Sequence, residues 1–190
     1  MITLPNECYY MIFNNLWPDH GNLFLCSLVN RQWCRLIIPI LWNDPEEHFT
    51  DIRLIRIFLL TLNAEEQALL IPFNITLPNH PKPLFEYINY ITSINDYLYY
   101  GIRKWLYDMK YDIKYKPFIT EYELENAVKC SLITMFLRTN KNLKYLHLNG
   151  ILCNQLILEG LYKNNTITTI TTMNLYKIDD NFKSKAIDTL

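Results

Sequence analysis

Apolar residues near the start of the chain recur at helical spacing. The spacing predicts a first helix, which Thr3 caps and whose first turn holds Pro5, where a missing N–H is harmless. Its apolar face follows positions i, i+3, i+4 and i+7 and consists of Tyr9, Ile12, Phe13 and Leu16. The run 17–21, which contains Pro and Gly, then predicts a turn.

Two further short helices are expected before residue 45, one over 23–29 and one over 30–38 that ends at Pro39. Charged residues are sparse in this segment, and its helices are apolar nearly all round. A unit this small buries little surface by itself, so the rest of the chain or a partner must cover the excess. The pattern therefore predicts a helical unit with a docking face.

The middle of the chain is expected to form helical connectors. Asn63 and Glu66 predict a capped short helix over 64–70. Four prolines between residues 72 and 83 predict an extended stretch, which is the best candidate for a domain boundary. Periodic apolar positions predict three more helices, over 51–62, 84–91 and 98–109.

A repeat follows a helix that the Thr120-x-x-Glu123 capping box predicts over 121–138. The pattern Leu-x-x-Leu-x-Leu at 143–148 recurs as Ile-x-x-Met-x-Leu at 170–175, a spacing of 27 residues. Leucine-rich repeats have periods of roughly 20–29 residues, each with a strand and a returning segment, here the helix 155–162. Two repeats are too few for a stable solenoid, so we expect a truncated repeat segment, capped by the 121–138 helix, whose far end frays or self-associates.

These patterns define a fold class that is mostly α with a small parallel-strand part. We expect a three-helix unit at 1–45 and a helical connector with a Pro-rich linker at 46–83. Residues 84–190 are expected to hold a helical cap and a short α/β solenoid of about two leucine-rich repeats.

Composition and charge exclude several classes of protein. The chain has 190 residues, 50% of them hydrophobic, and a formal net charge of −1. This balance excludes a disordered, highly charged tail and argues against a general nucleic-acid binder. Only four glycines leave little room for phosphate-binding loops. We find no catalytic motif and no metal-ligand spacing, so we expect no enzyme, no metal and no cofactor.

The cysteines and the N-terminus bear on location. Five widely spaced cysteines without a CxxC pair predict free buried thiols in a reducing compartment: Cys8, Cys26, Cys34, Cys130 and Cys153. The N-terminus does not read as a signal peptide, and no stretch reaches the roughly 18 apolar residues that a spanning helix needs. We therefore expect a cytosolic or nuclear protein without a membrane partner.

The first segment resembles an F-box over residues 3–43. The likeness rests on Leu-Pro-x-Glu at 4–7, Leu-Val-Asn-x-x-Trp at 28–33 and Leu-Trp at 41–42. An F-box is a three-helix module that docks on the Skp-family adaptor of a cullin–RING ubiquitin ligase, so the resemblance implies that partner. It implies adaptor contacts, or support for them, from Leu4, Pro5, Ile12, Leu16, Leu23, Cys26, Val29 and Trp33.

The resemblance implies a substrate receptor that brings an unknown target protein to the ligase and performs no chemistry itself. The target would meet the strand face of the repeats, where Tyr145, His147 and Asn149 alternate with buried leucines. One alternative is a shortened competitor that binds the adaptor without a productive target site. Another is an RNA-binding helical protein, suggested by the basic and aromatic run 103–116.

Overall fold

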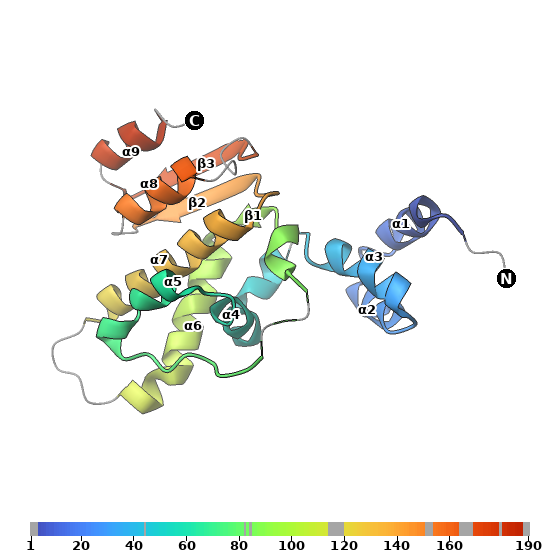
Figure 1. The fold of residues 1–190 in the computed structure, drawn as a ribbon, viewed down its shortest axis with the longest axis horizontal. Helices are drawn as coiled ribbons and strands as arrows, with labels where there is room; N and C mark the ends of the chain where they lie inside the picture. The colour runs from blue at the N-terminus through green and yellow to red at the C-terminus, as the bar shows by residue number, and fades with distance from the viewer. Residues whose placement is uncertain are drawn as a thin grey trace. The chain divides into compact units, whose positions relative to one another are not determined.

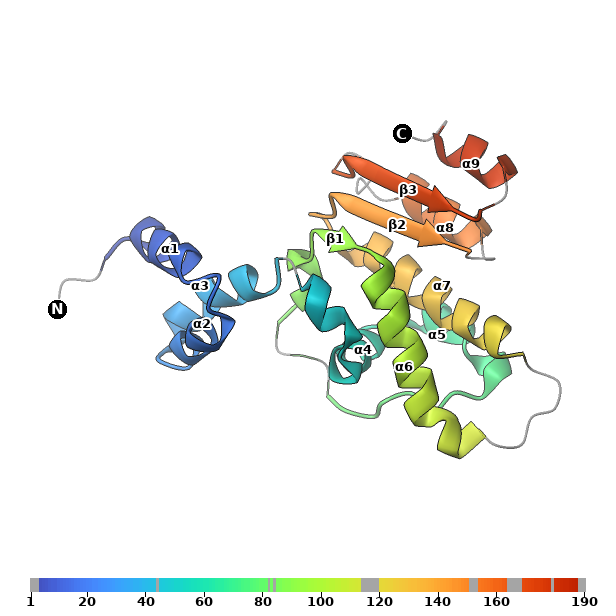
Figure 2. The same ribbon diagram turned by 180° about the vertical axis from the view of Figure 1, so that it is seen from behind.

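A computed structural model describes residues 4–43, 45–81, 83, 85–113, 120–150, 154–163, 169–178 and 180–187. The chain divides into two compact units, Met1–Pro45 and Glu46–Leu190, which are described separately below (Figures 1 and 2). The expected connector at 46–83 and the segment at 84–190 share the second unit.

Three helices form the first unit: α1 (Asn6–Asn15), α2 (His20–Ser27) and α3 (Arg31–Leu41). Pro5 is the N-cap of α1 rather than part of its first turn, and Thr3 lies outside the described residues. The α3 helix was expected to end at Pro39 but continues through it to Leu41. Proline removes only one backbone hydrogen bond there, within the last turn of the helix.

A small aromatic and aliphatic core holds the three helices together. Trp33 packs edge-on against Phe13, with ring centroids 5.1 Å apart, and Tyr9 stacks on Phe13 at 6.1 Å. The fully buried members of this core are Phe13, Leu23, Ile37 and Ile40. Because so few side chains are buried, packing stabilises this unit only weakly, and the helix caps contribute a larger share of its stability.

Asn30 caps α3, because its side-chain oxygen accepts a hydrogen bond of 2.8 Å from the Trp33 N–H. Asn30→Ala is expected to destabilise the first unit by about 1 kcal/mol. Urea unfolding would measure this loss, and Asn30→Ser, which keeps a capping oxygen, serves as the control. Equal stability of Asn30→Ala and the wild type would show that this cap contributes nothing.

Helices dominate the second unit. Both predicted capping boxes are confirmed, Asn63 with Glu66 ahead of α5 and Thr120 with Glu123 ahead of α7. The α-helices are α4 (Ile52–Leu59), α5 (Ala64–Ala68), α6 (Asp96–Ile113), α7 (Glu121–Thr139), α8 (Asn154–Lys163) and α9 (Asp180–Ile187). The 3-10 helices are η1 (Glu46–Thr50), η2 (Ile71–Phe73) and η3 (Tyr87–Tyr90).

The predicted helix at 84–91 is wrong, because only the short η3 forms there. Ile88 and Ile91 are nevertheless buried, as the apolar pattern required. The side-chain amide of Asn140 donates hydrogen bonds of 2.8 and 2.7 Å to the carbonyls of these two residues. A buried side chain therefore satisfies the backbone groups that a helix would otherwise have paired.

Three parallel strands form one sheet in the order β1 (Ser93–Ile94), β2 (Tyr145–Asn149) and β3 (Thr172–Tyr176). Tyr145 pairs with Thr172 and Asn149 with Tyr176, so the register of β2 and β3 is the predicted 27-residue spacing. The strand β1 was not predicted. It aligns Ile94 with Leu146, and Ile91 and Ile94 have the same spacing as Leu143 and Leu146.

The helices α7, α8 and α9 lie along one face of this sheet (Figure 1). From behind, no helix of the described residues covers the opposite face of β2 and β3 (Figure 2). On β3 the exposed side chains are Thr172, Asn174 and Tyr176. The second unit therefore presents an open strand face.

The prediction of free buried cysteines is wrong in two respects, because Cys8 is exposed and Cys26 and Cys34 are only half-buried, and because one cysteine is not free. Cys8, Cys26 and Cys34 are free thiols, but Cys130 is disulfide-bonded. The remaining cysteine, Cys153, lies outside the described residues.

Candidate functional site

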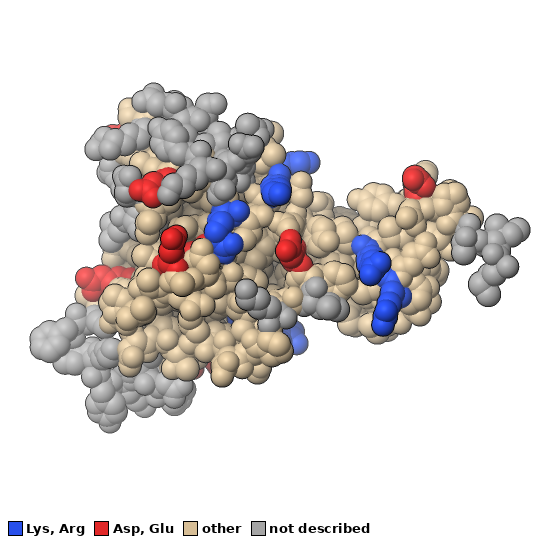
Figure 3. Space-filling model, viewed as in Figure 1, with Lys and Arg blue, Asp and Glu red and all other residues tan. Residues whose placement is uncertain are grey.

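The first unit exposes a large amount of apolar surface. In the described residues, nine of the sixteen exposed large hydrophobic side chains belong to this unit: Leu4, Tyr10, Met11, Ile12, Trp17, Phe24, Leu25, Leu28 and Val29. Charged side chains are sparse over its visible face (Figure 3). An apolar surface of this extent on a three-helix unit marks an interaction site.

The helix α2 buries two side chains and exposes larger apolar ones. Leu23 and Ser27 point inward and are buried, and the Ser27 hydroxyl donates a 2.6 Å hydrogen bond to the Phe24 carbonyl. Phe24, Leu25 and Leu28 face outward, with 54–66% of their surface exposed. Large apolar side chains that are exposed on the outer face indicate that this face contacts a partner.

The structure places the predicted adaptor residues in three environments. Leu4, Pro5, Ile12 and Val29 are exposed. Leu16, Cys26 and Trp33 are half-buried against the core, and Leu23 is completely buried within it. Leu23 therefore packs beneath the exposed residues and has no exposed surface of its own with which to contact a partner.

Sequence reasoning did not select four of the most exposed apolar side chains: Met11, Phe24, Leu25 and Leu28. The α2 helix begins three residues earlier than predicted, at His20 instead of residue 23. With the later start, the sequence pattern did not show which side chains face the core and which face outward. The inward spacing of Leu23 and Ser27 is the signal that reveals it.

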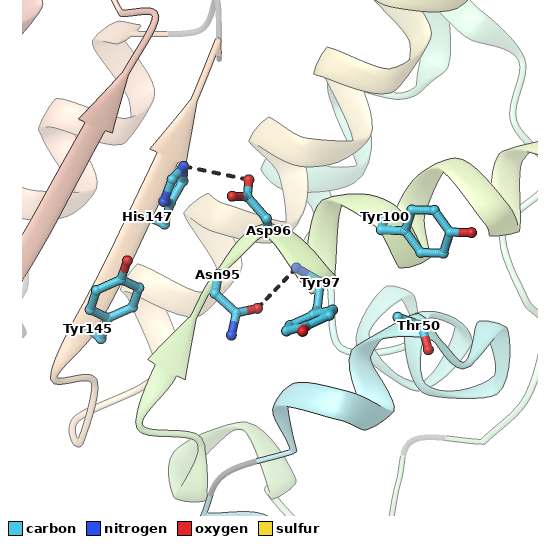
Figure 4. A pocket seen from close by; sticks show the side chains of 7 residues that line it. All are labelled: Thr50, Asn95, Asp96, Tyr97, Tyr100, Tyr145 and His147. Carbon is cyan, nitrogen blue, oxygen red and sulfur yellow. Dashed lines mark hydrogen bonds and ion pairs between the residues drawn. The ribbon is translucent and has the colours of Figure 1, made fainter.

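The second unit contains a pocket of about 560 Å³ beside the sheet. The end of η1, the junction between β1 and α6, the first turns of α6, and β2 all contribute to it (Figure 4). The described residues that line it are Thr50, Asn95, Asp96, Tyr97, Tyr100, Tyr145 and His147. Three tyrosines and one carboxylate thus dominate its chemistry.

Among the described residues, the Asp96 carboxylate has only long contacts. Its Oδ1 lies 3.4 Å from the Asn149 side-chain nitrogen and 3.5 Å from His147 Nε2. The Asp96 side chain keeps 66% of its surface exposed, while His147 is buried. A charge-assisted hydrogen bond is shorter, so these neighbours leave Asp96 free to accept a stronger donor.

The fully buried Tyr99 connects α6 to β2 next to Asp96 and His147. Its hydroxyl donates a hydrogen bond to the His147 carbonyl, and its ring packs edge-on against the His147 ring at 6.3 Å. Burial, with the charge of Asp96 as a smaller cause, raises the pKa of Tyr99 far above its usual range. Tyr99 therefore remains a neutral hydrogen-bond donor that ties α6 to β2.

Two of the three predicted target-facing residues, Tyr145 and His147, line this pocket, but the predicted exposure of His147 is wrong, because its side chain is buried between Leu146 and Leu148 in sequence and packs on Tyr99. The third, Asn149, is outside the lining but approaches it through Asp96. Sequence reasoning missed Asn95, Asp96, Tyr97 and Tyr100, because they are distant from the repeat in sequence and β1 was not recognised.

The basic and aromatic run 103–116 does not form one open surface. Trp105 is buried in the core of the second unit. Arg103 pairs with Glu125 at 2.9 Å, and Asp108 pairs with Arg56 at 3.1 Å. Residues 114–116 lie outside the described chain. Trp105 is thus occupied by packing and unavailable for stacking, while Tyr107 of the same run remains exposed.

Comparison with known proteins assigns the first unit. Residues 1–47 match the family model described as F-box-like, so the chain carries an F-box-like domain, which implies docking on a Skp-family adaptor. No curated protein and no solved structure matches the chain. Within the described residues, no helix is long and apolar enough to span a membrane, and no group of metal-ligating side chains is present.

Proposed function

We propose that this chain is a substrate receptor of a cullin–RING ubiquitin ligase. The F-box-like domain holds the Skp-family adaptor through its exposed apolar side chains. The second unit binds a target protein, and the complex brings that target to the ubiquitin carrier, which raises its effective concentration. The match over residues 1–47 carries this proposal, in which the chain binds its partners and performs no chemistry of its own.

We also propose that the second unit is a short leucine-rich-repeat module. The Thr92 carbonyl accepts hydrogen bonds from the N–H groups of Lys144 and Tyr145, at 2.8 and 3.1 Å. The Lys144 carbonyl accepts the same pair from Thr171 and Thr172, at the same two distances. The beginnings of β2 and β3 are thus each joined to the preceding repeat by the same pair of backbone hydrogen bonds, as expected for stacked repeats.

The pocket at the edge of the open strand face favours a receptor over a competitor that lacks a target site. For location we propose the cytosol or nucleus. The three cysteines of the F-box-like domain are free thiols, which suits a reducing compartment, whereas the disulfide at Cys130 does not.

Leu28→Asp combined with Val29→Asp is expected to abolish capture of a Skp-family adaptor. Both side chains are more than 60% exposed, so the change places two charges in the interface without disturbing the core. Loss of at least a hundredfold in affinity is expected, because buried unpaired charges at an interface are severely unfavourable. Co-purification and calorimetry with the adaptor would measure it.

Ile71→Asp is the matched control, since Ile71 is 73% exposed but lies in the second unit. It should leave adaptor binding unchanged. Trp33→Ala is a poorer probe, because Trp33 packs on Phe13 and its loss also weakens the core. A folded wild-type chain that captures no adaptor at micromolar concentration would refute the proposed function.

A further inference from the structure

We infer that the pocket between α6 and β2 binds a cationic side chain, foremost arginine, of a target polypeptide. This rests on the proposed function, because it names the chemistry that the target must present. The lining combines the Asp96 carboxylate with Tyr97, Tyr100 and Tyr145. Aromatic faces and a carboxylate both attract cations.

The charge of the pocket selects a cation over an anion. No Lys or Arg occurs among the described residues that line it. The first turn of α6 offers little to an anion, because Asn95 already accepts a 3.1 Å hydrogen bond from the Tyr97 N–H. Asp96 adds a negative charge at the same helix end. Asp96 is therefore the formal charge that the described lining of the pocket presents.

Asp96 is suited to accept the cation. Its two protein contacts are 3.4 and 3.5 Å long, and in Figure 4 its side chain lies between His147 and the first turn of α6. His147 is buried, and its Nε2 has no hydrogen bond in the described chain. A guanidinium can donate two short hydrogen bonds to the carboxylate and stack its plane on a tyrosine.

The surroundings indicate a polypeptide as the source of the cation. The pocket adjoins the open face of β2 and β3, where Asn174 and Tyr176 are exposed beside their strand partners His147 and Asn149. A chain crossing this face finds the exposed side chains of Asn174 and Tyr176 on β3 and the half-buried Asn149 on β2, whereas His147 is buried. Arginine then anchors one end of the contact, and the strand face supplies the rest.

Titration of the full chain with a blocked Gly-Gly-Arg-Gly-Gly peptide tests the inference, with amide NMR shifts of Asn95, Asp96 and Tyr97 as the readout. We expect saturable shifts with the arginine peptide. The same peptide with citrulline keeps the shape, removes the charge and should bind at least fivefold more weakly. Asp96→Asn should weaken the arginine peptide about tenfold.

Asp108→Asn is the matched control, because it removes the same charge from the same helix outside the pocket and should leave the peptide affinity within twofold. Tyr97→Ala should weaken binding about threefold, whereas Tyr97→Phe should retain it. Amide spectra of each variant establish that it is folded.

Equal binding of the arginine and citrulline peptides, or an unchanged affinity in Asp96→Asn, would overturn the inference. If free guanidinium ion binds as tightly as the peptide, the inference that the cation belongs to a polypeptide is overturned. No adaptor takes part in this titration, so its outcome is independent of adaptor capture, and failure of one can be distinguished from failure of the other.

Discussion

Replacing Gly101 with alanine is expected to destabilise the second unit by about 3 kcal/mol. Gly101 is buried in α6 beside η1, and an added Cβ would lie 1.9 Å from the Phe49 carbonyl oxygen and 3.0 Å from its carbonyl carbon. These atoms are backbone, so no rotamer change relieves the clash and one element must move. The loss exceeds the gain of about 1 kcal/mol that alanine normally brings to a helix interior.

Hydrogen exchange of the α6 amides, followed by mass spectrometry, would locate the effect, and urea unfolding would measure it. Gly160→Ala in α8 is the control within the same unit. Its added Cβ would lie 3.3 Å from the end of the Leu137 side chain, which can adjust, so a change within about 1 kcal/mol is expected. Unaltered stability of Gly101→Ala would mean that α6 and η1 are less closely packed than the structure shows.

The parts of the fold that were predictable are those determined by local chemistry. Asn63 with Glu66 and Thr120 with Glu123 satisfy helix N–H groups within a few residues, so their sequence pattern is sufficient. The 27-residue repeat predicted the register of β2 and β3, because equivalent positions of successive repeats pair with each other. By contrast, β1 has two residues and depends on partners 52 positions away.

The candidate sites follow the same division. The F-box-like segment was recognisable because its residues are contiguous. Only part of the pocket lining could be predicted. Tyr145 and His147 belong to the repeat, whereas Asp96 and Tyr97 lie beside it because β1 pairs with β2. The ion pair of Glu66 and Arg138 could not be predicted from the sequence either, because 72 residues separate the two.

Replacing Arg138 with leucine is expected to destabilise the second unit by about 3 kcal/mol. Glu66 is almost completely buried, and Arg138 donates hydrogen bonds of 2.6 and 2.9 Å to its two carboxylate oxygens. The Asn63 N–H supplies a further bond at 2.8 Å, but no positive charge. Without Arg138, a buried carboxylate is left uncompensated, which is far less favourable than losing the pair together.

A double-mutant cycle separates that penalty from the loss of packing. Glu66→Gln removes the charge but keeps an oxygen for the Asn63 N–H, so the double variant with Arg138→Leu should be more stable than Arg138→Leu alone. Arg56→Leu is the exposed control, because Arg56 and Asp108 are each about half exposed and their pair contributes less than about 1 kcal/mol. Urea unfolding of the four variants and the wild type gives each free energy. A double variant less stable than Arg138→Leu would show that packing by the arginine stem, and not the buried charge, holds α5 against α7.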